Sequence, residues 1–106
     1  MPTFVFSYRV PADYAPGGPE TLSRWSSWFE AMGEVVSDRG NPVFASTTVG
    51  NCGTGTRLGG YSFVTADDLE AAVALSKGSP ALDAGGGVEV GIVTVLNLEA
   101  PSSGRG

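Results

Sequence analysis

The sequence predicts an α+β domain of the ferredoxin-like type, with the element order β-α-β-β-α-β and an antiparallel sheet carrying two helices on one face. The main observation is the run Leu58–Leu75, which reads without interruption as a strand, a helix cap and an amphipathic helix. A glycine turn then leads into an apolar strand, Val88–Leu96. An alternating strand and a helix with one apolar face precede this half of the chain, at Thr3–Val10 and Glu20–Asp38.

The first half of the chain is predicted from two kinds of periodicity. In the strand Thr3–Val10, the side chains of Phe4, Phe6 and Tyr8 point to the same side. In Glu20–Asp38, apolar residues recur every three or four positions, as they do on one face of a helix: Leu22, Trp25, Phe29, Met32 and Val36.

Glycine and proline place the next boundaries. Gly33 weakens the predicted helix by about 1 kcal/mol relative to alanine, which close packing would explain. The run Gly40–Pro42 is expected to end that helix. A strand over Val43–Val49 is then expected to form a hairpin with the strand Leu58–Val64.

The second helix is predicted from its N-terminal cap. Thr65–Glu70 supplies a capping residue and places acids in the first turn, where the helix dipole favours them. We expect four of its residues to face the sheet, namely Leu69, Ala72, Val73 and Ser76. Lys77–Gly78 ends the helix, and Pro80 is expected to prevent it from restarting.

Length and composition indicate one globular domain. The chain has 106 residues, of which 42% are hydrophobic and 16% charged. We expect the domain to cover residues 1–99 and residues 100–106 to form a flexible tail. The net charge is −5 and the basic residues are scattered, which argues against nucleic acid and anionic membrane as partners. No apolar run is long enough to span a bilayer and no secretory signal is visible, so we expect a cytoplasmic protein.

Cysteine and histidine usage excludes several kinds of site. With one cysteine, Cys52, and no histidine, the chain has neither a disulfide of its own nor a Cys/His zinc site, and we expect no metal and no cofactor. The absence of histidine removes the commonest general base near neutral pH. Any acid–base chemistry would have to come from carboxylates, tyrosine, lysine or cysteine.

Three segments carry a resemblance to a known family. They are Ser37–Pro42, the run from Gly60–Val64 into Asp67–Val73, and the run from Lys77–Leu82 to Gly86–Val90. With the tryptophan-rich first helix, they resemble the YCII-related family, also called the DGPF domain family. The resemblance covers nearly the whole predicted domain.

The resemblance implies a dimeric α/β barrel, in which two four-stranded sheets pack face to face, with helices outside and a pocket in each protomer. Some relatives are small lyases or dehalogenase-like enzymes that use a histidine and an aspartate, and this chain has no histidine for that chemistry. Thr54–Arg57 fills the region of the DGPF tetrapeptide, and Ser79-Pro80 replaces the Cys-Pro of close relatives.

Two carboxylates are candidate catalytic residues. Asp38, at the end of the first predicted helix, is either a pocket acid or base or a structural group bonded to the turn before Pro42. Glu89 interrupts an apolar strand, so its carboxylate must be paired, hydrogen-bonded or protonated if that strand is buried. It belongs either to a pocket or to a dimer seam, with Arg9 or Arg57 as its ion-pair partner.

Four aromatic residues are candidate ligand-binding residues: Tyr8, Trp25, Trp28 and Tyr61. Trp25 and Trp28 either line a pocket between the first helix and the sheet or simply fill the core. Tyr8 and Tyr61 carry hydroxyl groups that need hydrogen-bond partners, whether a ligand or the protein itself. The thiol of Cys52 lies in a glycine-rich turn without a base, and we expect it to be inert.

The sequence alone leaves two functions open. One is a cofactor-free lyase, isomerase or cyclase whose aromatic pocket is reached by Asp38 or Glu89 as the acid or base. The other is a non-catalytic ligand-binding or accessory module that binds a small organic ligand or acts through its dimer surface. In both cases we expect a homodimer built through sheet faces, because Val88–Leu96 is apolar on both sides.

Overall fold

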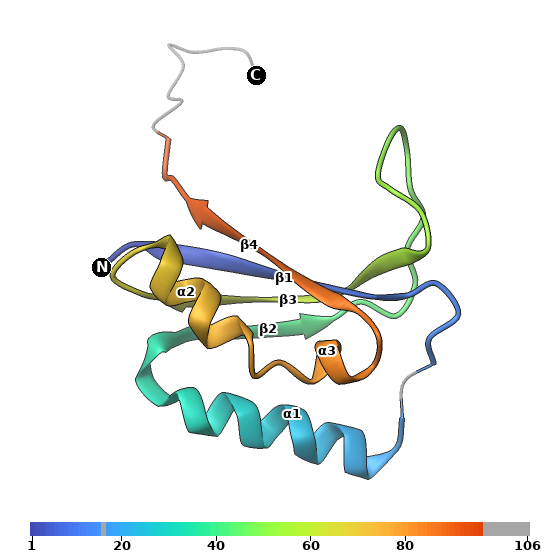
Figure 1. The fold of residues 1–106 in the computed structure, drawn as a ribbon, viewed down its shortest axis with the longest axis horizontal. Helices are drawn as coiled ribbons and strands as arrows, with labels where there is room; N and C mark the ends of the chain where they lie inside the picture. The colour runs from blue at the N-terminus through green and yellow to red at the C-terminus, as the bar shows by residue number, and fades with distance from the viewer. Residues whose placement is uncertain (16, 97–106) are drawn as a thin grey trace, which may run out of the picture.

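The computed structural model describes residues 1–15 and 17–96, which form an antiparallel sheet of four strands with helices on one side (Figure 1). The strand order is β2-β3-β1-β4. This confirms the predicted α+β class, the antiparallel sheet and the one-sided placement of the helices, an arrangement compatible with the ferredoxin-like fold. The tail predicted over residues 100–106, and residues 97–99 of the predicted domain, lie outside the described residues.

Strand β1, Thr3–Pro11, is the centre of the sheet and the source of the core. It pairs antiparallel with β3, Thr56–Thr65, on one side and with β4, Gly87–Val93, on the other. Its buried residues alternate as predicted: Phe4, Phe6, Tyr8 and Val10. This regular alternation buries one face of the strand beneath the helices.

The predicted first helix is too long. Helix α1 covers Pro19–Met32 and is followed by a 3₁₀ turn, η1, over Gly33–Val35. Gly33 has a φ of 67° and donates its N–H to the Phe29 carbonyl. A methyl group added at this position would have no neighbouring atom within 4 Å. The close-packing explanation for Gly33 is therefore wrong: this glycine ends the helix in a conformation that other residues rarely adopt.

Strand β2, Val36–Pro42, occupies residues that we assigned to the helix end and its stop signal. The strand contains a bulge, because Asp38 and Asn41 are three residues apart while their partners Phe63 and Tyr61 are two apart. Gly40 lies in this bulge with a φ of 71°. The strand predicted at Val43–Val49 is wrong, since residues 43–55 are described and contain none.

The second half of the chain follows the prediction more closely. Helix α2, Leu69–Ser76, is capped by Asp68, whose carboxylate accepts the Ala71 N–H at 2.8 Å. Pro80 does not block a restart but begins a short helix, α3, Pro80–Asp83. At a first helical position the missing proline N–H has no cost. Strand β4 ends at Val93, three residues before the predicted end of the last strand.

The face that α2 turns to the sheet differs from the prediction. Ala72 and Ser76 are buried as expected, but Leu69 and Val73 are 51% and 37% exposed. Ala71 and Leu75 pack against the core in their place. The helix is rotated about its axis so that Leu69 and Val73 lie on its outer flank.

In residues 1–15 and 17–96 there is no helix with the length and hydrophobicity to cross a membrane.

The bulge gives a test of the fold. Replacing Gly40 by alanine should destabilise the protein by more than the ~1–3 kcal/mol expected for a non-glycine residue at positive φ. The added methyl group would lie 1.7 Å from the Tyr61 carbonyl oxygen. Gly33→Ala is the control, because it also places an alanine at positive φ but without a clash. Urea unfolding measures both, and equal losses would show that the bulge is not held against β3.

Candidate functional site

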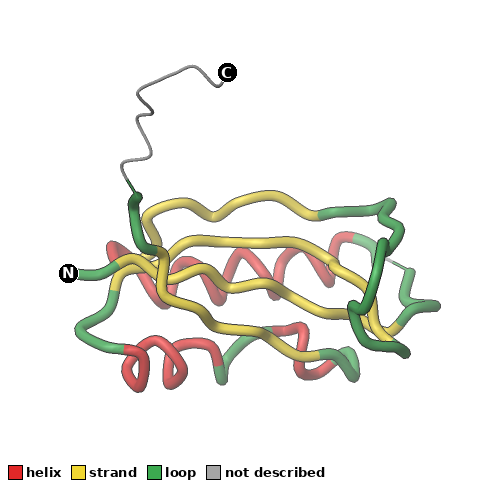
Figure 2. The backbone as a smooth tube through the Cα atoms, turned by 90° about the horizontal axis from the view of Figure 1, so that it is seen from above, coloured by secondary structure: helices red, strands yellow, loops and turns green. Residues whose placement is uncertain are grey.

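The two faces of the sheet differ in what covers them. Helices α1, α2 and α3 pack on the face of Phe4, Phe6 and Tyr8, here called the helix-covered face. In Figure 2 the strands lie in front of all the helices, so the view looks onto the opposite, open face. The strand alternation and the pairing of β1 with β3 and β4 place these side chains on the open face: Val5, Ser7, Arg9, Tyr61, Phe63 and Glu89.

An aromatic cluster fills the space between α1 and the sheet. The ring of Tyr8 meets Trp25 edge-on at 4.8 Å between centroids and Trp28 at 5.9 Å. Trp28 also stacks on Phe6 at 6.2 Å. The structure therefore brings together three of the predicted ligand-binding residues, but as partners of one another. Their rings pack together between this helix and the sheet, where we expected a cavity.

The Tyr8 hydroxyl is held by the protein itself. It donates to the Ser62 hydroxyl at 2.8 Å, and Ser62 donates to the Arg39 carbonyl in the β2 bulge at 2.6 Å. Tyr8 and Ser62 are both buried. Burial raises the pKa of the Tyr8 phenol far above its ordinary value, and the hydrogen bond to Ser62 offsets this only in part. Tyr8 is therefore a neutral structural group rather than a proton carrier near pH 7.

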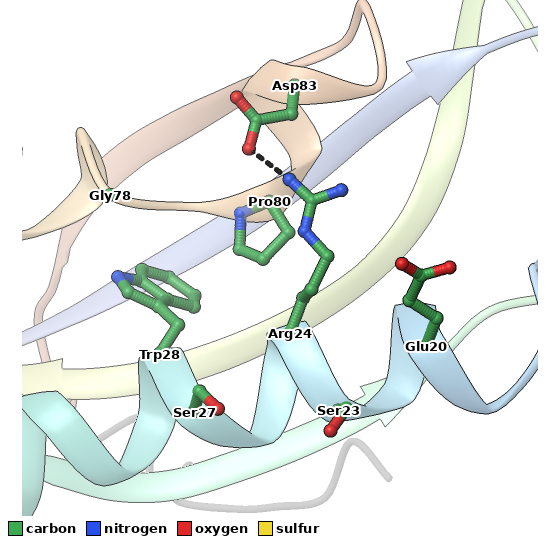
Figure 3. A pocket seen from close by; sticks show the side chains of 8 residues that line it. All are labelled: Glu20, Ser23, Arg24, Ser27, Trp28, Gly78, Pro80 and Asp83. Atoms are coloured by element: carbon green, nitrogen blue, oxygen red, sulfur yellow. Dashed lines mark hydrogen bonds and ion pairs between the residues drawn. The ribbon is translucent and has the colours of Figure 1, made fainter.

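A groove lies at the rim of the aromatic cluster, where α1 meets the Gly78–Pro80 turn and α3 (Figure 3). Its volume is about 460 Å³ and it is open to solvent. It is lined by Glu20, Ser23, Arg24, Ser27, Trp28, Gly78, Pro80 and Asp83. Gly78 keeps the space beside the indole free, because an added methyl group there would lie 3.0 Å from Trp28 Nε1.

The groove carries an uneven set of charges. The Arg24 guanidinium donates to the Asp83 carboxylate at 2.5 Å, and both side chains are more than half exposed. Glu20, on the same side of α1, has no ion-pair partner among the described residues. One positive and two negative groups leave this groove with a net negative charge beside an aromatic ring.

Sequence reasoning did not find this groove, although it selected Trp28. Its other wall depends on α3, and we expected Pro80 to prevent a helix there. The signal that could have found it is the spacing of Glu20, Arg24 and Trp28, four residues apart along one side of α1.

Asp38 has a structural task at the bulge. Its carboxylate accepts a hydrogen bond from the Gly40 N–H at 2.8 Å. This agrees with the alternative that Asp38 is a structural group bonded to the turn before Pro42. The neighbouring Arg39 reaches back to α1, with its guanidinium 5.3 Å from the centre of the Phe29 ring. The bulge thus redirects one side chain of β2 toward the helix.

Glu89 and Tyr61 lie away from the groove. Glu89 pairs with Ser7 across β1 and β4 and is exposed on the open face. Within the chain, Arg9 bonds Thr56 and Arg57 bonds backbone carbonyls, so neither pairs with Glu89. The Tyr61 hydroxyl accepts a hydrogen bond from the Asn41 amide at 3.2 Å.

Neither Cys52 nor any group of metal-binding side chains forms a further functional site among the described residues. The thiol of Cys52 is exposed in the loop after β2 and points to the Val49 carbonyl at 3.5 Å. Among residues 1–15 and 17–96, no three His, Cys, Asp or Glu side chains lie close enough together to hold a metal ion.

The comparisons with known proteins return no match: neither a family model, nor a curated protein, nor a solved structure is similar to this chain.

The buried tyrosine predicts a specific pH dependence. In the unfolded chain Tyr8 should ionise near pH 10, whereas in the folded chain its raised pKa keeps it neutral. Its contribution to stability is therefore complete below about pH 10 and is lost as the pH rises beyond that value, at roughly 1 kcal/mol per pH unit. Tyr8→Phe should flatten this alkaline slope in urea unfolding measured at pH 8 and above pH 10. Identical slopes would show that the phenol is not desolvated.

Proposed function

We propose that this chain is a non-catalytic small-molecule-binding module, working as a homodimer, whose groove between α1 and α3 holds a small organic cation. The observation that carries the proposal is the charge arrangement around Trp28. Arg24 is neutralised by Asp83, which leaves the Glu20 carboxylate uncompensated at the groove. An aromatic ring and a free carboxylate are the groups that recognise a protonated amine.

Binding is favoured over catalysis by the positions of the carboxylates. The enzyme hypothesis needs Asp38 or Glu89 at an aromatic pocket, but Glu89 lies on the open face and Asp38 holds the β2 bulge. At the groove itself, Asp83 is tied to Arg24, and an open site does not exclude water as acid–base chemistry prefers. We also propose that the chain is a cytoplasmic member of the YCII-related family. The segments Ser37–Pro42 and Lys77–Leu82 and the order of the helices and strands support the family membership.

The ligand should be an amine with a flat apolar part. Trp28 and Pro80 offer an apolar floor, and Ser23 and Ser27 offer hydroxyls along one side of α1. A cation over an exposed aromatic ring contributes about 0.5–1 kcal/mol. With a similar contribution from a screened ion pair, these two interactions favour binding by about 1–2 kcal/mol, so the dissociation constant should be roughly tens of millimolar or weaker.

Calorimetric titration tests the ligand class. Arylalkylamines should bind, while the matched aryl alcohols and aryl carboxylates should bind more weakly or not at all. Glu20→Gln should weaken amine binding by up to about fivefold, the equivalent of 1 kcal/mol for an exposed ion pair. Glu30→Gln is the matched control, since Glu30 is exposed on α1 but does not line the groove. Equal affinity for amines and carboxylates would contradict the proposal.

The homodimer is supported by the chemistry of the open face. An antiparallel sheet with one solvated face normally carries polar residues there, yet this face presents Val5, Tyr61 and Phe63 beside Ser7, Arg9 and Glu89. A second copy of the same face is the simplest cover and would complete a barrel of two sheets.

Sedimentation of variants tests this interface. The wild-type particle should have an even multiple of the 10.8 kDa chain mass, and Phe63→Glu should halve it by placing a charge in the apolar contact. Phe44→Glu should leave the mass unchanged, because Phe44 is 68% exposed in the loop between β2 and β3. Circular dichroism confirms that both variants fold. A wild type that sediments as a 10.8 kDa monomer at micromolar concentration would contradict the homodimer.

A further inference from the structure

The two edges of the sheet are built differently. At one edge, β2 carries the bulge at Gly40, the charged residues Asp38 and Arg39, and Pro42. These are the features by which proteins prevent a free edge from pairing with another strand. The other edge, β4, has neither a bulge nor a proline: its seven residues are Gly-Val-Glu-Val-Gly-Ile-Val, with regular pairing to β1 and one charge, Glu89.

Exposed apolar side chains flank the β4 edge on the helix-covered side. Among the strands, helix α2 packs chiefly against β4. Its exposed flank carries Leu69 and Val73, while Ala71 and Leu75 on the other flank pack into the core. Ile92 is on the same side of β4 as the core residues Val88 and Val90, yet it is 60% exposed. Leu69, Val73 and Ile92 are here called the β4 shelf.

The sequence of β4 matches an antiparallel copy of itself. Val90 is the midpoint of Gly87–Val93, so a two-fold axis at Val90 pairs all seven residues. In this register Glu89 lies opposite Gly91 of the second copy, and Val88 lies opposite Ile92. A two-fold axis at Glu89 would place the two carboxylates directly opposite each other, which is unfavourable. The single charge therefore disfavours the register centred on Glu89, and among the remaining registers the one centred on Val90 uses the whole strand.

We propose that β4 pairs edge to edge with β4 of a second copy, in the antiparallel register centred on Val90, and that the β4 shelves of the two copies cover each other. The strand supplies backbone hydrogen bonds and the shelf supplies the apolar contact, as in other cases of strand addition. This contact leaves the open face free. It is compatible with pairing of the open faces, and the two contacts together give a tetramer of two-fold symmetric pairs.

Sedimentation with single and double variants tests the edge contact. The wild type should have four times the 10.8 kDa chain mass, and Ile92→Lys should halve that mass. Leu69→Lys should do the same, and it serves as a second variant if Ile92→Lys does not fold. Leu22→Lys is the matched control, because Leu22 is 69% exposed on α1, away from this edge. Ile92→Lys combined with Phe63→Glu should give monomers.

Amide hydrogen exchange adds a readout of the strand itself. Peptides covering Gly87–Val93 should be protected in the wild type and exchange faster in Ile92→Lys, while β1 peptides stay protected in both. A wild-type mass that neither shelf variant changes, or β4 exchange that is equal in wild type and Ile92→Lys, would overturn the edge contact. If Phe63→Glu still halves the mass in that case, only the edge contact fails and the proposed homodimer stands.

Discussion

The burial of Phe4, Phe6 and Tyr8 against α1 is the constraint on which the rest of the structure depends. These side chains project from one face of the central strand, and the indoles of Trp25 and Trp28 close over them. The Tyr8 hydroxyl extends this packing through Ser62 to the β2 bulge, so the core, the sheet and the end of α1 are held by one connected set of contacts. Between α1 and the sheet the aromatic rings pack against one another, and the groove lies at their rim.

The placement of the polar residues follows from this core. The aromatic rings occupy the helix–sheet interface, and a groove lies beside Trp28 at the rim, where α1 and α3 approach. The carboxylates of Asp38 and Glu89 project away from that interface, one to hold a bulge and one into the open face. The described residues therefore leave three surfaces uncovered: a charged groove, a sheet face that mixes aromatic and polar residues, and the strand edge of β4. Their chemistry fits a small cation for the first and further copies of the chain for the other two.

Local sequence predicted those parts of the fold that depend on local forces. The alternation of Phe4, Phe6 and Tyr8 and a helix cap within Thr65–Glu70 need only neighbouring residues, and both were predicted correctly; the structure places the cap at Asp68. The boundary between α1 and β2 was not, because Gly40 acts as a helix stop in isolation but as a bulge once Tyr61 lies beside it. The candidate site was only half visible for the same reason. Trp28 could be selected from helical spacing, but its neighbours Arg24 and Asp83 are 59 residues apart and meet only in the folded chain.

Hydroxyl-radical footprinting of the full chain tests the central claim most directly, namely that a second copy covers the open face. Tyr61 and Phe63 lie on that face, and Phe44 is an internal reference in an exposed loop. At high micromolar concentration Tyr61 and Phe63 should be labelled much more slowly than Phe44, and their relative labelling should rise on dilution as copies separate. Labelling of Tyr61 and Phe63 that keeps a constant ratio to Phe44 at every concentration, and is as fast as expected for the isolated chain, would contradict the account.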